Sequence, residues 1–325
     1  MNFKSILESK NLKPSSIKTY TANYKTLLKH LKLDEITAGW IEDNALVIQE
    51  EVIEHKEFSY SKKRNYLNVL LLFLQKGTPV YEKYFNHIKA LNEEYKQITK
   101  QGTYSEKEQD KLLPYEVLKN KVEAQILTFA TKFNTLKSLK KISETDYNDL
   151  RSIVIQSLYI LHPPRRTDYA NMKLCLDTGK CDGDSNLLIY TKFKKPVKFI
   201  FKKELVKSTT EEDEEVKIEN PALRSILKMY IYVCLLRKQE YLFVNEKGGK
   251  MTSNNFTQLV KRVFERAFNK KINISLLRKI YITKEYQSSG AGELARQMNH
   301  SVGVASTIYN KSEGGVKENI KIVIS

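Results

Sequence analysis

Apolar and polar positions alternate with helical period through the first third of the chain. Residues 15–33 come directly after Pro14 and begin with a Ser-Ser pair that can cap a helix. Residues 45–55 and 59–75 carry a similar apolar stripe. We therefore predict a small all-helical bundle over residues 1 to about 95. The apolar and aromatic positions that define the first stripe are Ile17, Tyr20, Tyr24, Leu27, Leu28 and Leu31.

The periodicity is lost between residues 95 and 110, a polar stretch that contains Gly102. This stretch is the candidate linker between two domains, which we place at residues 1–100 and 101–325. Beyond the linker, helical patterns recur at residues 117–130, 146–161, 222–236, 255–268, 274–283 and 291–298.

Two short stretches interrupt the helical pattern of the second domain. Residues 187–193 and 197–202 are rich in β-branched and aromatic side chains and flank a Lys-Lys-Pro break, which predicts a hairpin or small sheet. The acidic stretch 207–218 is predicted to be an exposed loop. The expected fold class is therefore mainly α with a small β-sheet (α+β).

The charge balance points to a polyanionic partner. Of 325 residues, 55 are Lys or Arg and 38 are Asp or Glu, which gives a formal net charge of +17. Nucleic acid is the leading candidate for the partner. The alternative is a basic protein whose lysines are simply solvated.

Lysines and tyrosines alternate in two of the N-terminal helical stretches. Residues 18–25 read KTYTANYK and residues 60–66 read YSKKRNY. Such a face can follow a DNA backbone, because cations neutralise phosphates and hydroxyls add hydrogen bonds. The alternative is that the tyrosines form the core stripe and the lysines form its solvated rim.

Cysteine and histidine usage argues against metal and disulfide chemistry. The chain has three cysteines, Cys175, Cys181 and Cys234, an odd number without CxxC spacing. We therefore expect neither a disulfide framework nor a zinc site, and a reducing compartment fits best. Five histidines are scattered, with no two at ligand spacing on one helix face, so metal catalysis is not expected.

No membrane segment or signal peptide is expected. The longest apolar runs, such as residues 69–74, fall far short of the roughly 18 residues that a membrane-spanning helix needs. The first residues lack the apolar core of a signal peptide.

The stretch 296–311, RQMNHSVGVASTIYNK, carries the most informative chemistry, because it places His300 and Tyr309 nine positions apart. A phenol has an ordinary pKa of about 10, so a tyrosine that attacks phosphate needs cations and hydrogen-bond donors around that phosphate. Such groups occur upstream as Arg278, Lys192 and the pair Arg165 and Arg166.

The order arginine, hairpin lysine, arginine, histidine, tyrosine resembles the catalytic half of tyrosine recombinases. The phrase Pro-Pro-Arg-Arg-x-Asp-Tyr at residues 163–169 looks most like the integrases of large eukaryotic DNA viruses and their mobile elements. The resemblance covers most of residues 105–312, whereas the N-terminal third agrees only in pattern. It implies a helical core-binding domain followed by a tyrosine-recombinase catalytic domain.

The resemblance implies a role for each matching residue. Tyr309 would attack the scissile phosphate and form a 3′-phosphotyrosyl link, and His300 would donate a hydrogen bond to a phosphate oxygen. Arg278 and either Arg165 or Arg166 would clamp the phosphate. Matching the family phrase Arg-x-x-acidic to Arg165 and Asp168 favours Arg165 as the first catalytic arginine. Matching the phrase Pro-Pro-x-Arg from the two prolines favours Arg166. We expect the pair to be held stiffly between His-Pro-Pro and a helix.

A lysine on a mobile hairpin would protonate the departing 5′ oxygen in such an enzyme, so that it leaves as a hydroxyl. Lys192 matches this position best, and Lys194 and Lys195 compete with it. The resemblance implies no cofactor and no metal, double-stranded DNA as partner, and a homotetramer on DNA.

Two positions depart from the family pattern. Ser275 stands three residues before Arg278, where a histidine is usual, and Asn299 replaces a usual glycine. Serine can bind a phosphate oxygen, but it cannot shuttle a proton near neutral pH. We therefore expect a slower enzyme.

The expected function is site-specific recombination that integrates or excises a mobile or viral genome. The alternatives are a type IB-like DNA topoisomerase and a catalytically impaired DNA-binding relic. The expected location is intracellular, in a host nucleus or a cytoplasmic viral factory.

Overall fold

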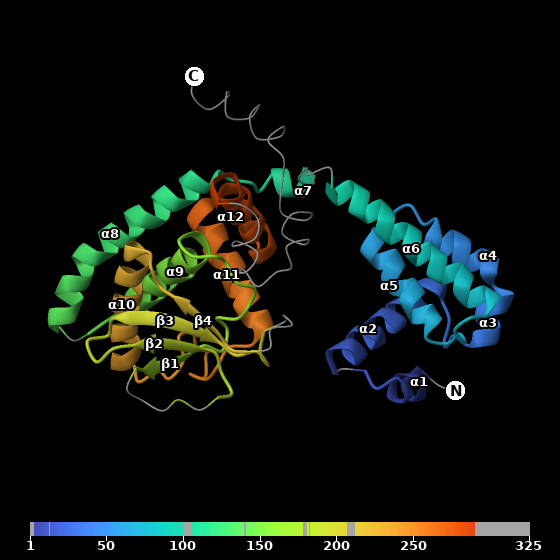
Figure 1. Cartoon of the computed structure of the whole chain (residues 1–325), viewed down its shortest axis with the longest axis horizontal. Helices are drawn as coiled ribbons and strands as arrows, with labels where there is room; N and C mark the ends of the chain where they lie inside the picture. The colour runs from blue at the N-terminus through green and yellow to red at the C-terminus, as the bar shows by residue number, and fades with distance from the viewer. Residues whose placement is uncertain are drawn as a thin grey trace, which may run out of the picture. The chain divides into compact units, whose positions relative to one another are not determined.

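The computed structural model describes residues 3–12, 14–100, 106–139, 141–177, 181, 183–206 and 212–289 (Figure 1). The chain divides into two compact units, Met1–Gln101 and Gly102–Ser325. No helix within the described ranges is long and apolar enough to cross a membrane.

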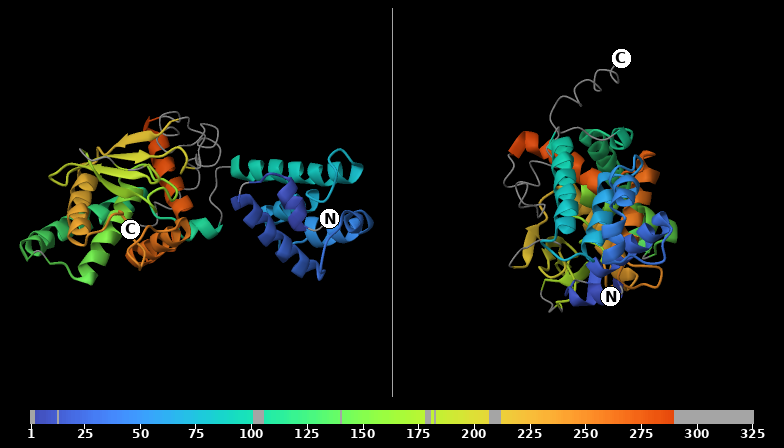
Figure 2. Two further views of the ribbon diagram at one scale, coloured as in Figure 1. Left: turned by 90° about the horizontal axis from the view of Figure 1, so that it is seen from below. Right: turned by 90° about the vertical axis from the view of Figure 1, so that its right-hand side faces the viewer.

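The N-terminal unit is helical throughout its described residues, as predicted. Helix α5 packs against both α2 and α6, and α6 runs alongside it (Figure 2). Leu27, Leu67, Leu70 and Tyr84 are fully buried between these helices. The elements are α1 (Phe3–Ser9), α2 (Pro14–Leu31), α3 (Ala38–Asp43), α4 (Ala45–Ile48), the π-helix η1 (Gln49–Ile53), α5 (Tyr60–Leu71) and α6 (Pro79–Lys100).

Two boundaries in this unit differ from the prediction. The single helix expected over residues 45–55 ends at Ile48 and continues as the π-helix η1. The expected linker was placed too early, because α6 continues to Lys100.

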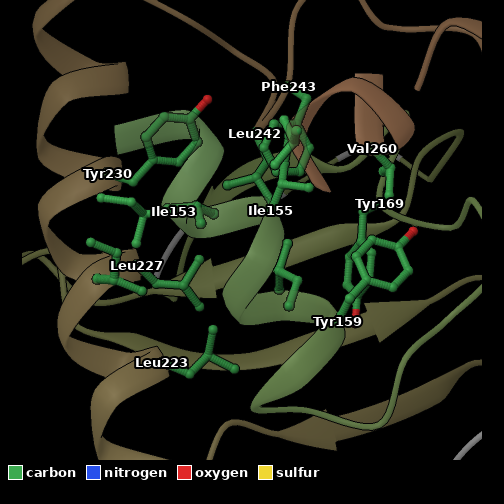
Figure 3. Packing of buried hydrophobic residues seen from close by; sticks show 14 of the residues in the cluster. Ile153, Ile155, Tyr159, Tyr169, Leu223, Leu227, Tyr230, Leu242, Phe243 and Val260 are labelled. Atoms are coloured by element: carbon green, nitrogen blue, oxygen red, sulfur yellow. The ribbon is translucent and has the colours of Figure 1, made fainter. Parts of the chain in front are cut away.

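The second unit is built around α9 (Glu144–Ile160), which contacts α8, α10, α11 and α12. Figure 3 shows Ile153 of α9 beside Leu227 and Tyr230 of α10, and Ile155 beside Leu242 and Phe243. The Ser143 side chain caps α9 by accepting a hydrogen bond from the Asp146 amide. The other helices are α7 (Glu106–Gln109), α8 (Tyr115–Leu139), α10 (Pro221–Leu236), α11 (Ser253–Phe268) and α12 (Ile274–Ser289).

A four-stranded sheet in the order β1-β2-β3-β4 completes this unit. The strands β1 and β2 are parallel, and the other two pairs are antiparallel. Leu188 and Phe199 on one face join the helical core, whereas Leu187 and Ile189 form a small cluster on the other face. The strands are β1 (Lys173–Leu176), β2 (Leu187–Tyr190), β3 (Pro196–Phe201) and β4 (Glu214–Lys217).

The predicted fold class, mainly α with a small β-sheet, is confirmed, and the hairpin β2–β3 lies where it was expected. Three local predictions were wrong. Strand β1 was not foreseen, and β4 occupies part of the acidic stretch 207–218 that was predicted to be a loop. A turn over residues 168–171, and no helix, follows Arg165 and Arg166.

The structure also pairs two of the three cysteines. Cys175 of β1 forms a disulfide with Cys181, with their Cα atoms 6.1 Å apart. The expectation of no disulfide was therefore wrong for this pair, while Cys234 is a buried free thiol. Sequence separation alone could not show that Cys181 lies beside β1.

Candidate functional site

Arg165 and Arg166 lie side by side in the chain but in opposite environments. Arg165 follows His162-Pro163-Pro164 in the connection from α9 to β1, and its side chain is 1% exposed. Its guanidinium lies over the Phe201 ring, 4.4 Å from the ring centroid. Arg166 is exposed.

The buried guanidinium of Arg165 is held by a carboxylate from another element. Nη1 of Arg165 donates to Oε2 of Glu214 in β4 at 2.9 Å, and Nη2 donates to Oε1 of the same carboxylate. Glu214 was not among the predicted site residues. The stretch that contains it had been predicted to be a loop, so its pairing with Arg165 had no signal in the sequence.

Arg278 brings a second buried guanidinium to the same region. It lies on α12 and is 3% exposed. Burial raises the pKa of the Asp168 carboxyl, and the charges of Arg165, Arg278 and Arg166, in that order, oppose this rise. All three charges therefore act on one carboxyl group, although Arg278 comes from a segment far from Arg165 and Arg166 in the sequence.

Ser275 lies one turn before Arg278 on α12 and is exposed, whereas Arg278 is buried. The next residue, Lys279, forms an ion pair with Glu108. Ser275 is thus on the solvent side of the helix that delivers Arg278.

The three candidate lysines lie at the tip of the β2–β3 hairpin. The amide of Lys194 donates to the Thr191 carbonyl at 2.7 Å, and the Thr191 amide donates to the Lys195 carbonyl at 2.9 Å, which closes a tight turn. Lys194 has a positive φ of 61° and is half-buried, whereas Lys192 and Lys195 are exposed. The Lys192 ammonium lies 5.2 Å from the centroid of the Phe193 ring, and the Lys194 ammonium lies 5.9 Å from that of Tyr232.

His162 is a buried neighbour of this site that sequence reasoning did not single out. Its Nδ1 lies 3.1 Å from the Pro163 carbonyl oxygen and 3.3 Å from the Tyr169 hydroxyl. Burial and, secondarily, the charge of Arg165 lower the pKa of His162 to about 4. The imidazole is therefore neutral at pH 7. Its place directly before Pro-Pro-Arg-Arg was the one signal that could have marked it.

The alternating lysines and tyrosines of the N-terminal unit divide between surface and core. Lys18, Lys25 and Lys62 are exposed, whereas Tyr24 packs against the core and Tyr66 is 2% exposed. The lysines are thus available to phosphates, while these two tyrosines serve packing.

His300 and Tyr309 lie outside the described residues. Their approach to Arg165 and Arg278 therefore stays a prediction, as does the helix expected at residues 291–298.

No family model and no curated protein matches the sequence. Among solved structures, the chain is similar to that of XerA recombinase, at 15% identity and a TM-score of 0.40, covering 99% of this chain and 97% of that one. It is similar to a lambda integrase(75-356) dimer bound to a COC′ core site, at 14% identity and a TM-score of 0.49, covering 96% and 94%. A lambda integrase tetramer bound to a Holliday junction is similar at 11% identity and a TM-score of 0.46, covering 97% and 78%.

These similar structures are of a recombinase and an integrase, the class of protein that the sequence resembles. Because every TM-score is below 0.5, we take neither residue roles nor activity from them.

Proposed function

We propose that this chain is a site-specific DNA recombinase that cuts and rejoins duplex DNA through a 3′-phosphotyrosyl intermediate. The observation that carries the proposal is that the charges of two buried arginines, Arg165 and Arg278, both favour the ionised form of the Asp168 carboxyl. Both arginines are almost completely buried, yet they come from the α9–β1 connection and from α12. Burying two guanidinium groups costs free energy unless anions compensate them, and in this structure the carboxylate of Glu214 does so for Arg165.

A scissile phosphate is an anion that suits this arrangement. During attack, its non-bridging oxygens gain negative charge, and preorganised guanidinium groups stabilise that charge. Arginine holds two oxygens at once and keeps its proton at any physiological pH. In this proposal Arg165 and Arg278 clamp the phosphate, and His300 donates a further hydrogen bond.

The hairpin tip supplies the proton for the leaving group. An expelled 5′ alkoxide needs a proton donor, and Lys192 is our first candidate, with Lys194 and Lys195 as competitors. Tyr309 attacks the phosphorus, and a 5′ hydroxyl from a second duplex reverses the step. The partner is double-stranded DNA bound by a homotetramer, since strand exchange joins two duplexes.

We further propose that the reaction integrates or excises a viral or mobile genome, in a host nucleus or a cytoplasmic viral factory. The support for this finer statement is the Pro-Pro-Arg-Arg-x-Asp-Tyr phrase at residues 163–169.

One observation favours a second candidate, a catalytically impaired DNA-binding relic. Both terminal nitrogens of Arg165 are bound by Glu214, and Ser275 stands where a histidine is usual. If Glu214 never leaves, Arg165 cannot grip a phosphate.

Covalent trapping separates the two candidates. The probe is a pool of nicked duplexes with a randomised core, in which the short 5′-hydroxyl fragment diffuses away after cleavage and leaves the protein on the DNA. A recombinase gives an adduct that survives denaturing electrophoresis. DNA binding without any adduct would establish the relic.

A further inference from the structure

Three side chains of the kinds that bind transition metals meet in the N-terminal unit. His30, Glu51 and His55 each offer a ligand atom within 4.8 Å of the others. Nε2 of His30 lies 3.2 Å from Oε2 of Glu51. Zinc bonds of about 2.0–2.1 Å in a tetrahedral site place neighbouring ligand atoms roughly 3.3 Å apart. The His30–Glu51 pair already has this spacing.

The fold assembles this cluster from segments that are separate in the sequence. His30 lies in the last turn of α2, Glu51 in the π-helix η1, and His55 just beyond the end of η1. The Glu51 carbonyl oxygen lies 3.0 Å from His30 Nε2, so this nitrogen donates a hydrogen bond here and must give up that proton when it binds a metal ion. Single π-helical turns are frequently found at functional sites.

Both imidazole rings are held in place by the same aromatic side chain. His55 stacks on Phe58 with ring centroids 3.8 Å apart, and the His30 ring lies 4.8 Å from that of Phe58. The two imidazole centroids are 5.2 Å apart. Ligands whose rotamers are already restricted lose little entropy when a metal binds.

The surrounding charge also favours a cation. The C-terminal end of α2, where His30 lies, carries the negative end of the helix dipole. Glu50 and Glu54 flank the cluster in sequence. Lys62 opposes them, with its ammonium 3.5 Å from the Phe58 ring centroid. Lys29 and Lys56 also adjoin the two histidines in sequence, so the preference for a cation rests on the Glu51 carboxylate and on the end of α2.

We propose that His30, Glu51 and His55 form a binding site for one divalent transition-metal ion, Zn²⁺ foremost, that fastens the end of α2 to η1. Two imidazoles and one carboxylate suit Zn²⁺, whereas Mg²⁺ and Ca²⁺ prefer oxygen ligands alone. Glu51 is half-exposed, so water can fill the fourth position. The site is independent of the phosphate chemistry proposed for the second unit.

The test is a Zn²⁺ titration of the tag-free, metal-stripped full-length chain by calorimetry, without reductant so that Cys175 and Cys181 stay paired. We expect one ion per chain at this site. Glu51→Gln removes one ligand charge at constant shape, and His55→Phe keeps the stack on Phe58 while deleting a ligand. Loss of an outer-shell partner weakens metal sites about 10–100-fold, so loss of a direct ligand should weaken Zn²⁺ binding by at least about 100-fold.

His87→Phe is the matched control, because His87 is a half-buried histidine on α6 of the same unit outside the cluster. It should leave Zn²⁺ affinity unchanged. Circular dichroism verifies that each variant is folded. The proposal is overturned if the unmodified chain binds no Zn²⁺, or if Glu51→Gln and His55→Phe, both folded, bind it as tightly as the unmodified chain.

Discussion

The carboxylate of Glu214 accepts hydrogen bonds from both terminal nitrogens of Arg165, whose side chain is 1% exposed. This two-pronged geometry is also the one by which arginine holds a phosphate. The guanidinium of Arg165 is therefore held in the orientation that binds an oxyanion, here the carboxylate of Glu214. For the proposed recombinase, Glu214 holds Arg165 in position until a phosphate replaces its carboxylate.

The first prediction concerns the stability that Glu214 provides. Glu214→Gln should lower the free energy of unfolding by about 1–3 kcal/mol, because the buried Arg165 loses a charged acceptor. Glu215→Gln is the control on the same strand, since Glu215 pairs with the partly exposed Lys198. That variant should cost less than about 1 kcal/mol. Urea unfolding measures the free energy of unfolding of both variants. Equal decreases would show that the pairing of Glu214 with Arg165 stabilises the fold no more than the pairing of Glu215 with Lys198.

The second prediction decides between the two adjacent arginines. Arg165→Lys should slow covalent adduct formation by about 10²–10³-fold, since lysine cannot reproduce the two-pronged contact. Arg166→Lys should leave the rate close to that of the unmodified chain, because Arg166 is exposed. Single-turnover cleavage of the nicked duplex gives both rates. A large loss in Arg166→Lys alone would reverse the assignment.

The third prediction identifies the general acid among the hairpin lysines. Lys192→Ala should slow cleavage of ordinary DNA but not of a substrate with sulfur in place of the leaving oxygen. A thiolate leaves without a proton, because thiols have pKa values near 8.5. Lys194→Ala and Lys195→Ala are the controls. If the sulfur substrate restores the cleavage rate only in Lys194→Ala or only in Lys195→Ala, the lysine replaced in that variant is the general acid.

The fourth prediction follows from the pKa of His162. Burial lowers this pKa to about 4, which is below that of an exposed histidine. The folded state keeps this imidazole neutral, whereas the unfolded chain binds a proton below about pH 6.5. Above pH 6.5, titration of His162 should therefore not change the free energy of unfolding. As the pH falls from 6.5 toward 4, that free energy should decrease by about 3 kcal/mol in all.

His162→Gln removes the titrating group, so its loss of stability between pH 7 and pH 4.5 should be smaller than that of the unmodified chain. Urea unfolding at both pH values gives the comparison. Parallel losses in the two proteins would mean that His162 does not titrate with a lowered pKa.

The helices were predictable from sequence because their apolar stripes face a core, as in residues 59–75 and 255–268. The two strands that escaped prediction, β1 and β4, are the edges of the sheet. Each has only four residues, and β4 has alternating half-buried and exposed positions with charged side chains. The charged strand β4 carries little hydrophobic signal, whereas β1 is apolar but too short for four residues to define a period.

The candidate site was predictable only in part, for a related reason. The sequence identified the Arg165–Arg166 pair. Which of the two arginines is buried in the site depends on which side chain the turn points inward, and the sequence does not show this. The partners Glu214 and His162 were missed, because contacts across elements leave no local pattern. The same holds for His30, Glu51 and His55, which no single helix face brings together.

The central claim is that Tyr309 is the residue that becomes joined to DNA. Trypsin should release residues 297–311 as one peptide, and Tyr309 is its only tyrosine. The direct measurement is mass spectrometry of the adduct after nuclease and trypsin digestion, with Tyr309→Phe as the paired variant. The account predicts that the nucleotide remnant lies on peptide 297–311 and that Tyr309→Phe forms no adduct. A remnant on another tyrosine, or an undiminished adduct in Tyr309→Phe, would contradict it.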